Sequence, residues 1–422
     1  MGILLIQDCY ASLQESKAFD LEENTQGTER IIVFDNANSE IPYRIPAIAQ
    51  ALNGDIIAVT DYRYSKADIG MKENGRLDLR YRIKDHDTGD WGEIMTLIAA
   101  KGEGDEIVSF GDPCIVADRE FDLVLVTSCC GNVSFPKGNH ENHQGWARII
   151  SEDGGKTWSE FEDISDQIFN QLDKGSKGEI RCFFIGSGKI LQSTKIKNDK
   201  YYRLYCAALV KTGDGTNVNY ALYSDDFGKN WKVLGDVDEI PVPQGGDEPK
   251  VEELPNGNVL ISSRTKGGRL YNIFDFSNIE KGEGKWGAAA LSTSDVNGVI
   301  GSSNACNGEV LMIPVMDISK GEKTYLLLQS LPLGPNDRSH VGINYKVLDT
   351  PDKYNSPENI AKDWDGVFEV TDKSSAYSTM ILNTNGKVSF LYEENSYNGG
   401  YDIVYDEFSV AEITNGRYQL SF

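Results

Sequence analysis

Two stretches of this chain, SEDGGKTW (Ser151–Trp158) and SDDFGKNW (Ser224–Trp231), share the pattern S-x-D-x-G-x-x-W and begin 73 residues apart. Each follows a short β-rich run, WARIIS in the first case and NYALYS in the second. In such a turn the Asp carboxylate accepts backbone N–H groups, the Gly takes a conformation that other residues resist, and the Trp packs beneath the hairpin. Two full matches that each follow a strand favour a structural repeat over two chance turns.

The rest of the chain has the same texture from Ile31 onward. Degenerate copies of the turn, KDHDTGDW and SNIEKGEGKW, end at Trp91 and Trp286. Short β-rich runs such as GDIIAVT, DLVLVTS and NVLISS alternate with turns such as LNGD, PNGN and TNGK. This punctuation predicts an all-β, antiparallel architecture, with EDISDQIFNQL as a minor helical excursion.

The domain organisation follows from the uniform texture and the chain length. We read residues 1–30 as a tail or first strand that ties the ends of the fold together, and 31–422 as one domain. That region provides about 65 residues per blade if it forms six four-stranded blades of a β-propeller. The repeat spacing alone does not separate six blades from seven.

Composition limits the partners. A net charge of −24 and a pI near 4.6 argue against nucleic acid and anionic membrane surfaces as partners. The sequence has no run of about 18 apolar residues, so no membrane span is expected. The start, MGILLIQDCYASLQ, is too weak to be a signal peptide.

Cysteine and histidine usage gives little sign of disulfides or metal. Seven cysteines without regular spacing argue against a disulfide framework, and adjacent Cys129 and Cys130 are read as buried thiols. His140 and His143 lie in the polar loop GNHENHQG, which could hold a metal. A solvated loop is favoured because no third ligand is suggested nearby.

The segment YRIPAIAQALNGDIIAV (Tyr43–Val59) resembles the [FY]-R-I-P segment that opens the catalytic domain of sialidases, a family that also carries the repeated turn, called the Asp box. The resemblance extends from about Ile31 to Phe422. It implies a six-bladed β-propeller of four-stranded antiparallel sheets and the activity of an exo-alpha-sialidase of the bacterial type. A glycoside hydrolase of this kind removes terminal sialic acid from glycans.

Sialic acid carries a carboxylate on its anomeric carbon, and guanidinium groups bind carboxylates in bidentate geometry. The resemblance implies three such arginines: Arg44 in the Y-R-I-P segment, Arg264 in VLISSRTKGG, and Arg338 in LGPNDRSHVG. Ser262 departs from the Asn that the family has two positions before the second Arg. Glu393, in FLYEE, matches a carboxylate that orients the first Arg.

The nucleophile implied by the family is a tyrosine. Sialidases are a recognised exception among glycosidases in using one, and a neutral Tyr avoids like-charge repulsion with the substrate carboxylate. Tyr377, in SSAYSTM, matches the family's A-Y-S segment. A phenol needs a base. Glu248, 16 residues before Arg264, is the first choice, Glu253 is the fallback, and Glu252 is another nearby competitor.

The family also uses an acid that protonates the leaving oxygen and later activates water. Asp68, in TDYRYSKADIG, matches it, and Asp61 is read as a turn or pocket-wall residue. Arg63 and Asp112 match substrate-binding positions beside the sugar ring. The apolar wall expected for an N-acetyl group has no assigned residues.

These residues predict a two-step, retaining hydrolysis without metal or organic cofactor. The expected partners are sialylated glycans, and the expected state is a monomer that is secreted, periplasmic or cell-surface, with a leader not visible at the start of the sequence. Three rival readings remain: a trans-sialidase with the same residues, a sialic-acid-binding propeller without turnover, and a structural Asp-box protein.

Overall fold

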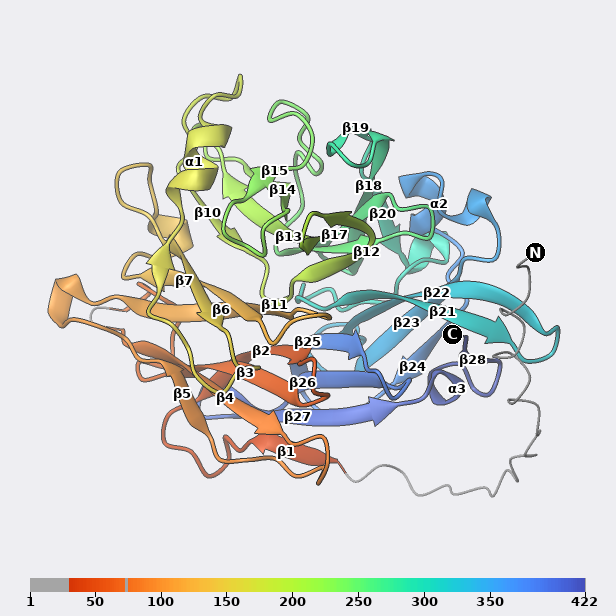
Figure 1. Cartoon of the computed structure of the whole chain (residues 1–422), viewed down its shortest axis with the longest axis horizontal. Coiled ribbons are helices and arrows are strands. Elements are labelled where there is room, and N and C mark those ends of the chain that lie inside the picture. The colour runs from red at the N-terminus through yellow and green to blue at the C-terminus, as the bar shows by residue number, and fades with distance from the viewer. Residues whose placement is uncertain (1–29, 73–74, 422) are drawn as a thin grey trace, which may run out of the picture.

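The computed structural model describes residues 30–72 and 75–421. The predicted tail of residues 1–30 therefore lies, except for Arg30, outside the described residues. Within the described residues the chain forms six sheets arranged as a ring (Figure 1). The prediction of an all-β, six-bladed propeller is confirmed.

Each sheet is built mainly from consecutive antiparallel strands. The first sheet contains β2 (Tyr43–Gln50), β3 (Ile56–Arg63), β4 (Leu77–Lys84) and β5 (Met95–Ile98). The second contains β6 (Ser109–Ala117), β7 (Val124–Gly131), β8 (Gly145–Ser151), β9 (Glu162–Asp163) and β11 (Gly188–Lys189). The third contains β10 (Cys182–Ile185), β12 (Leu191–Asn198), β13 (Tyr201–Lys211), β14 (Asn217–Ser224) and β15 (Lys232–Val233).

The other three sheets complete the ring. The fourth contains β16 (Pro249–Glu253), β17 (Val259–Thr265), β18 (Gly268–Asn278), β19 (Glu283–Trp286) and β20 (Ala290–Thr293). The fifth contains β21 (Val310–Asp317), β22 (Glu322–Pro332), β23 (Val341–Val347), β24 (Gly366–Glu369) and β28 (Tyr418–Leu420). The sixth contains β25 (Ser375–Leu382), β26 (Val388–Tyr397), β27 (Gly400–Phe408) and β1 (Ile31–Phe34). Four sheets thus have a short fifth strand beyond the predicted four.

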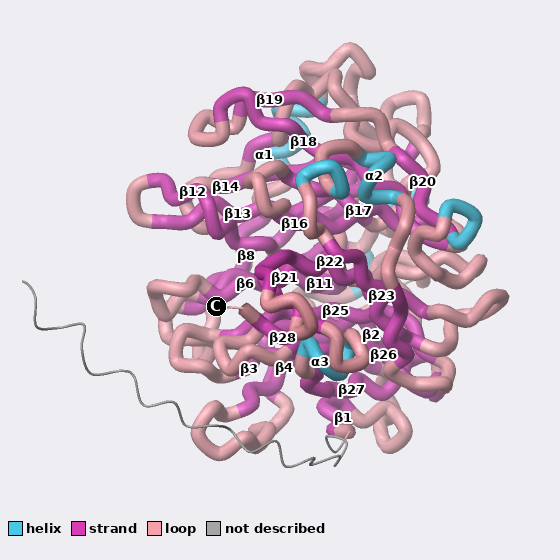
Figure 2. Tube along the Cα trace, turned by 90° about the vertical axis from the view of Figure 1, so that its right-hand side faces the viewer, coloured by secondary structure: helices cyan, strands magenta, loops and turns pink. Residues whose placement is uncertain are grey.

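Helical segments are short. The α-helices are α1 (Asp166–Leu172), α2 (Pro357–Ala361) and α3 (Val410–Ile413). The 3-10 turns are η1 (Gly104–Glu106), η2 (Phe135–Lys137), η3 (Ser294–Val296) and η4 (Pro351–Lys353). Helix α1 lies within the predicted excursion EDISDQIFNQL. The side view in Figure 2 shows α2 and α3 on the outside of the molecule. Among the described residues, no helix is long and apolar enough to cross a membrane.

The ring is closed by strands from the two ends of the described chain. Strand β1 pairs antiparallel with β27, and Ile31 lies opposite Tyr405. Residues 1–30, read from the sequence as a tail or a first strand that ties the ends of the fold, stay a prediction; among the described residues the strand that closes this sheet begins at Ile31.

Both full Asp boxes are turns between the third and fourth strands of a blade. In the first, Asp153 accepts hydrogen bonds from the backbone N–H groups of Lys156 at 3.0 Å and Thr157 at 2.9 Å. In the second, Asp226 accepts the N–H of Asn230 at 2.8 Å. The two degenerate copies occupy the same place in other blades, between β4 and β5 and between β18 and β19. The repeat read from the sequence is therefore a structural repeat.

Apolar residues fill the spaces between the sheets. One cluster includes Trp146 and Trp231, each 2 % exposed, so the Trp of the second Asp box packs in the core. The six cysteines among the described residues are buried and free, as the sequence predicts for Cys129 and Cys130. Burial raises the pKa of both of these thiols.

The first strands of three neighbouring blades, β2, β6 and β25, each have an irregular register near the centre of the ring. Strand β2 contacts both β6 and β25. Each has a bulge: between Arg44 and Ala47 in β2, between Gly111 and Cys114 in β6, and between Ser375 and Ser378 in β25. A bulge re-aims a side chain out of the regular alternation. Each of these bulges includes or borders one predicted site residue, Arg44, Asp112 or Tyr377.

Candidate active site

A pocket of about 450 Å³ lies where the blades meet. Side chains from the strands or connecting loops of all six sheets line it. Seven of the nine predicted site residues line it: Arg44, Asp68, Asp112, Glu248, Arg264, Arg338 and Tyr377. The other two, Arg63 and Glu393, are buried next to lining residues.

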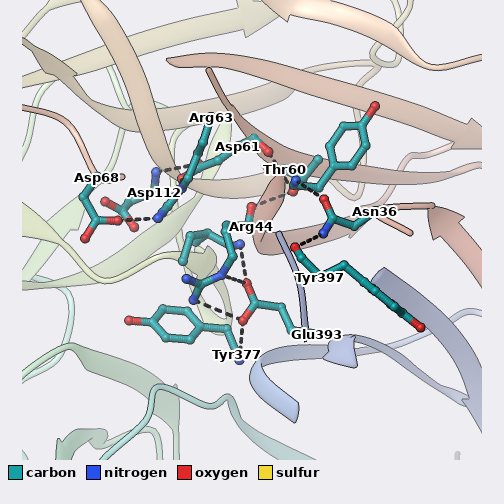
Figure 3. A network of polar contacts seen from close by, with 12 residues as sticks. Asn36, Arg44, Thr60, Asp61, Arg63, Asp68, Asp112, Tyr377, Glu393 and Tyr397 are labelled. Atoms are coloured by element: carbon teal, nitrogen blue, oxygen red, sulfur yellow. Dashed lines mark hydrogen bonds and ion pairs between the residues drawn. The ribbon is translucent and has the colours of Figure 1, made fainter. Parts of the chain in front are cut away.

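Arg44, on β2, is held by Glu393, on β26. The Arg44 Nε donates to Glu393 Oε1 at 2.7 Å, and Nη2 donates to Oε2 at 3.2 Å (Figure 3). Glu393 also accepts the backbone N–H groups of Ile45 at 2.8 Å and Tyr377 at 3.0 Å. Burial lowers the pKa of Arg44, but the charge of Glu393 outweighs this and raises it above its usual value. The guanidinium therefore stays charged and faces the pocket in a fixed orientation.

The second and third arginines come from the fourth and fifth sheets. Arg264, on β17, places Nη1 3.0 Å from Glu248 Oε2. Arg338, in the loop between β22 and β23, donates from Nη2 to the carbonyl of Ala305 at 2.8 Å. The guanidinium carbons of Arg44 and Arg338 lie 5.5 Å and 5.9 Å from the centre of the Tyr377 ring. Three cations therefore lie close to the Tyr377 side chain, a suitable arrangement for binding a carboxylate.

Tyr377, on β25, and Glu248, directly before β16, form a short polar contact in the pocket. The Tyr377 hydroxyl donates to Glu248 Oε1 at 2.5 Å and accepts from Arg264 Nη1 at 3.1 Å. Burial raises the pKa of Tyr377 well above its usual value, and the Glu248 charge adds to this. The phenol is thus neutral at rest, and Glu248 is placed to take its proton.

The two competitors for the role of base have other partners. Glu253 accepts hydrogen bonds from the hydroxyls of Ser193 and Thr194, each at 2.6 Å. Glu252 pairs with Lys189 at 2.6 Å. Neither lines the pocket. The spacing argument that favoured Glu248 therefore agrees with the geometry.

Asp68 lies on the loop between β3 and β4 and lines the pocket. Its side chain is 63 % exposed, and one oxygen pairs with Arg63 Nη1 (Figure 3). Arg63 was predicted to bind substrate, but its side chain is only 4 % exposed and bonds both Asp68 and Asp61. Direct substrate contact by Arg63 stays a prediction.

Asp112 lines the pocket beside Asp68 and adopts a left-handed backbone conformation with φ of 54°. Burial raises the pKa of Asp112 well above its usual range, with the charges of Asp61 and Asp68 as further causes. A carboxyl that holds its proton more tightly can donate as well as accept hydrogen bonds. This suits contact with sugar hydroxyls.

One wall of the pocket is apolar, and the sequence did not identify it. It consists of Ile69, Phe135, Pro136, Phe184 and Leu209. These residues come from separate segments, among them turn η2 and strands β10 and β13. No shared motif marks them, so only the tertiary structure brings them together.

The two histidines considered as metal ligands have ordinary partners. His140 Nε2 lies 2.9 Å from Asp173 Oδ2, and His143 Nδ1 lies 2.8 Å from the Gln144 carbonyl. Across residues 30–72 and 75–421, no group of three His, Cys, Asp or Glu side chains is placed to hold a metal ion.

The fold is a β-propeller whose central pocket is lined by three arginines. A family model described as a BNR repeat-like domain matches residues 70–390. The chain belongs to this family of BNR repeat-like proteins, which agrees with the Asp-box repeats found in the sequence.

Two curated relatives are both sialidases. The chain is 28 % identical over 229 residues to a sialidase of Micromonospora viridifaciens, covering 53 % of this chain and 32 % of that protein. It is 22 % identical over 246 residues to a sialidase of Paraclostridium sordellii, covering 55 % of each chain. The matched parts thus span about a third and about half of these relatives. The predicted resemblance to sialidases with Asp-box repeats is confirmed.

Solved structures agree with the fold. A Trypanosoma rangeli sialidase, in a covalent-intermediate complex with 2,3-difluorosialic acid, has a TM-score of 0.64 at 17 % identity, covering 89 % of this chain and 57 % of that chain. A leech intramolecular trans-sialidase, complexed with 2,7-anhydro-Neu5Ac, has a TM-score of 0.69 at 14 % identity, covering 93 % of this chain and 71 % of that chain.

Proposed function

We propose that this protein is a retaining exo-sialidase that hydrolyses terminal alpha-linked sialic acid from glycans through a tyrosyl-sialyl intermediate. The observation that carries the proposal is the contact of the Tyr377 hydroxyl with Glu248 at 2.5 Å, in a pocket that three arginines line. A carbohydrate-binding site without turnover has no use for a buried phenol paired with a base. The likeness to curated sialidases supports the same activity.

In the first step, Arg44, Arg264 and Arg338 bind the substrate carboxylate. The Tyr377 oxygen attacks the anomeric carbon, and its proton passes to Glu248. The bond from the anomeric carbon to the glycan oxygen breaks, and that oxygen takes a proton from Asp68. Sialic acid is then covalently bound to Tyr377.

In the second step, Asp68 takes a proton from water, and the resulting hydroxide attacks the anomeric carbon from the side that the glycan left. The bond to the Tyr377 oxygen breaks, and Glu248 returns the proton to the phenolate. Two displacements at one carbon retain its configuration. Each group ends in its starting protonation state, so the cycle needs no further reactant.

The test is proton NMR of 3′-sialyllactose during turnover. Wild type should release sialic acid whose first-formed anomer is alpha, and Tyr377→Phe should release none above background. Tyr220→Phe is a matched control because that hydroxyl donates to the Val237 carbonyl at 2.8 Å in the core of the third blade. An initial beta anomer, or full activity in Tyr377→Phe, would contradict the proposal.

An intramolecular trans-sialidase is the second candidate, favoured by the structural likeness to the leech enzyme. It would use the same residues but let a hydroxyl of the bound sugar replace water in the second step. The same NMR experiment separates the two, because 2,7-anhydro-sialic acid would accumulate in place of free sialic acid. The monomeric state and the exclusion of nucleic acid stay predictions.

A further inference from the structure

Asp61 is a buried carboxylate that the scheme above does not use. It lies on β3 and is 0 % exposed. Its Oδ2 accepts from Arg63 Nε at 3.0 Å and from Arg63 Nη2 at 2.7 Å. Its Oδ1 accepts the backbone N–H of Asp112 at 2.9 Å. Both carboxylate oxygens therefore accept hydrogen bonds, Oδ2 from Arg63 and Oδ1 from the backbone of Asp112.

These contacts link Asp61 to two carboxylates that line the pocket. Arg63 uses Nε and Nη2 for Asp61, which leaves Nη1 to pair with Asp68 (Figure 3). Asp112 sits in the bulge of β6 at a φ of 54°, a conformation that non-glycine residues rarely adopt without support. The hydrogen bond that the Asp112 N–H donates to Asp61 supplies that support across the boundary between the first and second blades.

We propose that Asp61 is a positioning residue for the acid step, fixing Asp68 through Arg63 and fixing Asp112 through its backbone. The inference rests on the proposed sialidase activity. In this inference Asp61 holds both pocket carboxylates, Asp68 and Asp112, in place. Asp61 lies on a strand, whereas Asp68 lies on a loop that is largely exposed to solvent.

The charges around Asp61 agree with this role. The Arg63 guanidinium pairs with Asp61 and Asp68, and its charge also opposes the rise in the pKa of Asp112. The other charged or titratable neighbours are Arg44, Glu248 and the Cys129 thiol. Burial raises the pKa of Asp61 to about 6, although Arg63 opposes the rise. Above that pH Asp61 is ionised, and its negative charge offsets much of the positive charge of the Arg63 guanidinium that pairs with Asp68.

The role predicts a dependence on the leaving group. A sugar hydroxyl needs a proton as it departs, whereas an acidic phenol departs without one. A misplaced Asp68 should therefore slow cleavage of sialyllactose much more than cleavage of an aryl sialoside. The ratio kcat/KM isolates this first step, because it excludes the later hydrolysis in which Asp68 serves both substrates as base.

The experiment compares Asp61→Asn with wild type on 3′-sialyllactose and on 4-methylumbelliferyl sialoside. We expect kcat/KM to fall by about 10²-fold on sialyllactose and by less than about 10-fold on the aryl substrate, since acid–base catalysis contributes at least that much. In the pH profile of kcat/KM on sialyllactose, the basic limb should move to lower pH, because the variant lacks a negative charge beside Arg63.

Asp225→Asn is the matched control, because Asp225 also holds a buried arginine. It pairs with Arg203 at 2.6 Å and 2.9 Å in the third blade, outside the pocket. In Asp225→Asn, the ratio of kcat/KM on sialyllactose to kcat/KM on the aryl sialoside should equal that of wild type. Equal losses on both substrates in Asp61→Asn, with an unmoved pH profile, would overturn the inference.

Two further variants and one structure keep the test decisive. If Asp61→Asn does not fold, Asp61→Glu and Arg63→Lys should show the same substrate selectivity, and its absence in both overturns the inference. Wild type inactive on both substrates would contradict the proposed function instead. If the wild type is inactive, the positioning role can still be tested by a crystal structure of Asp61→Asn. Unchanged positions of Asp68 and Asp112 in that structure would overturn the role.

Discussion

At the level of single residues, Glu393 orders the greatest number of active-site groups. It is fully buried and accepts hydrogen bonds from the Arg44 guanidinium and from the backbone N–H groups of Ile45 and Tyr377. Ile45 is a β-branched residue at a φ of 58°, which requires support from its surroundings. One carboxylate thus orients the first arginine and also supports the backbone at both the arginine and the nucleophile.

Glu393→Gln should therefore reduce both stability and substrate binding. The amide leaves the buried end of Arg44 without an opposite charge, and breaking a buried pair in this way costs about 3–5 kcal/mol. Urea unfolding should show the loss, and KM should rise because Arg44 is no longer oriented. Glu160→Gln is the control, since Glu160 is 82 % exposed in its pair with Lys101. An unfolding midpoint in Glu393→Gln equal to that of the control would contradict this account.

At the level of elements, the Asp-box turn is a local structure that the sequence specifies closely. Asp153 accepts from two backbone N–H groups and from the hydroxyls of Ser151, at 2.8 Å, and Thr157, at 2.6 Å. Asp153 is exposed, and the desolvation that it undergoes opposes ionisation, but these hydrogen bonds outweigh it and lower the pKa of Asp153 to about 2. All partners lie within a few residues, so the pattern of letters suffices to predict the turn.

The lowered pKa gives the turn a defined pH dependence. The folded state favours ionised Asp153, so the stabilisation is present above the unfolded value near 3.8 and is lost as pH falls toward about 2. Asp153→Asn should be less stable than wild type at pH 7, and the difference should shrink as pH falls from about 4. Thermal unfolding across this range measures it, and a difference independent of pH would contradict it. Activity of the folded variant at pH 7 should match wild type.

The strands that carry the site show where sequence reasoning stops. The motifs around Arg44 and Tyr377 identified both residues, but the bulges that turn them toward the centre depend on register with neighbouring strands. Asp61 was read as a turn or wall residue. Its partner Arg63 lies two positions further along the same strand, but the Asp112 backbone meets Asp61 only after the first two blades pack together. The Ala305 carbonyl that holds Arg338 has no side-chain signal at all.

At the level of the whole molecule, the ring brings together residues that are far apart in the chain. Tyr377 and Glu248 are separated by 129 positions, and Arg44 and Glu393 by 349. The sequence predicted the blades and the repeated turns because these are local. Six blades came from the family resemblance, since spacing alone also allowed seven. The apolar pocket wall could not be predicted, because its residues become neighbours only when the ring closes.

The acidic composition has a counterpart at this scale. The chain carries a net charge of −24, yet three arginines line one pocket. Each has an oxygen partner: Glu393 for Arg44, Glu248 for Arg264, and the Ala305 carbonyl for Arg338. Sheltered cations are screened less than surface charges, so a negatively charged protein can still bind an anionic sugar.

The central claim, that Tyr377 is the nucleophile of a retaining sialidase, can be tested most directly by trapping the intermediate. Incubation with 2,3-difluorosialic acid, followed by peptide mass spectrometry, should find one sialyl adduct per chain, attached to Tyr377. The adduct should be absent in Tyr377→Phe. An adduct on another residue, or turnover of sialosides by wild type without any adduct, would contradict the account.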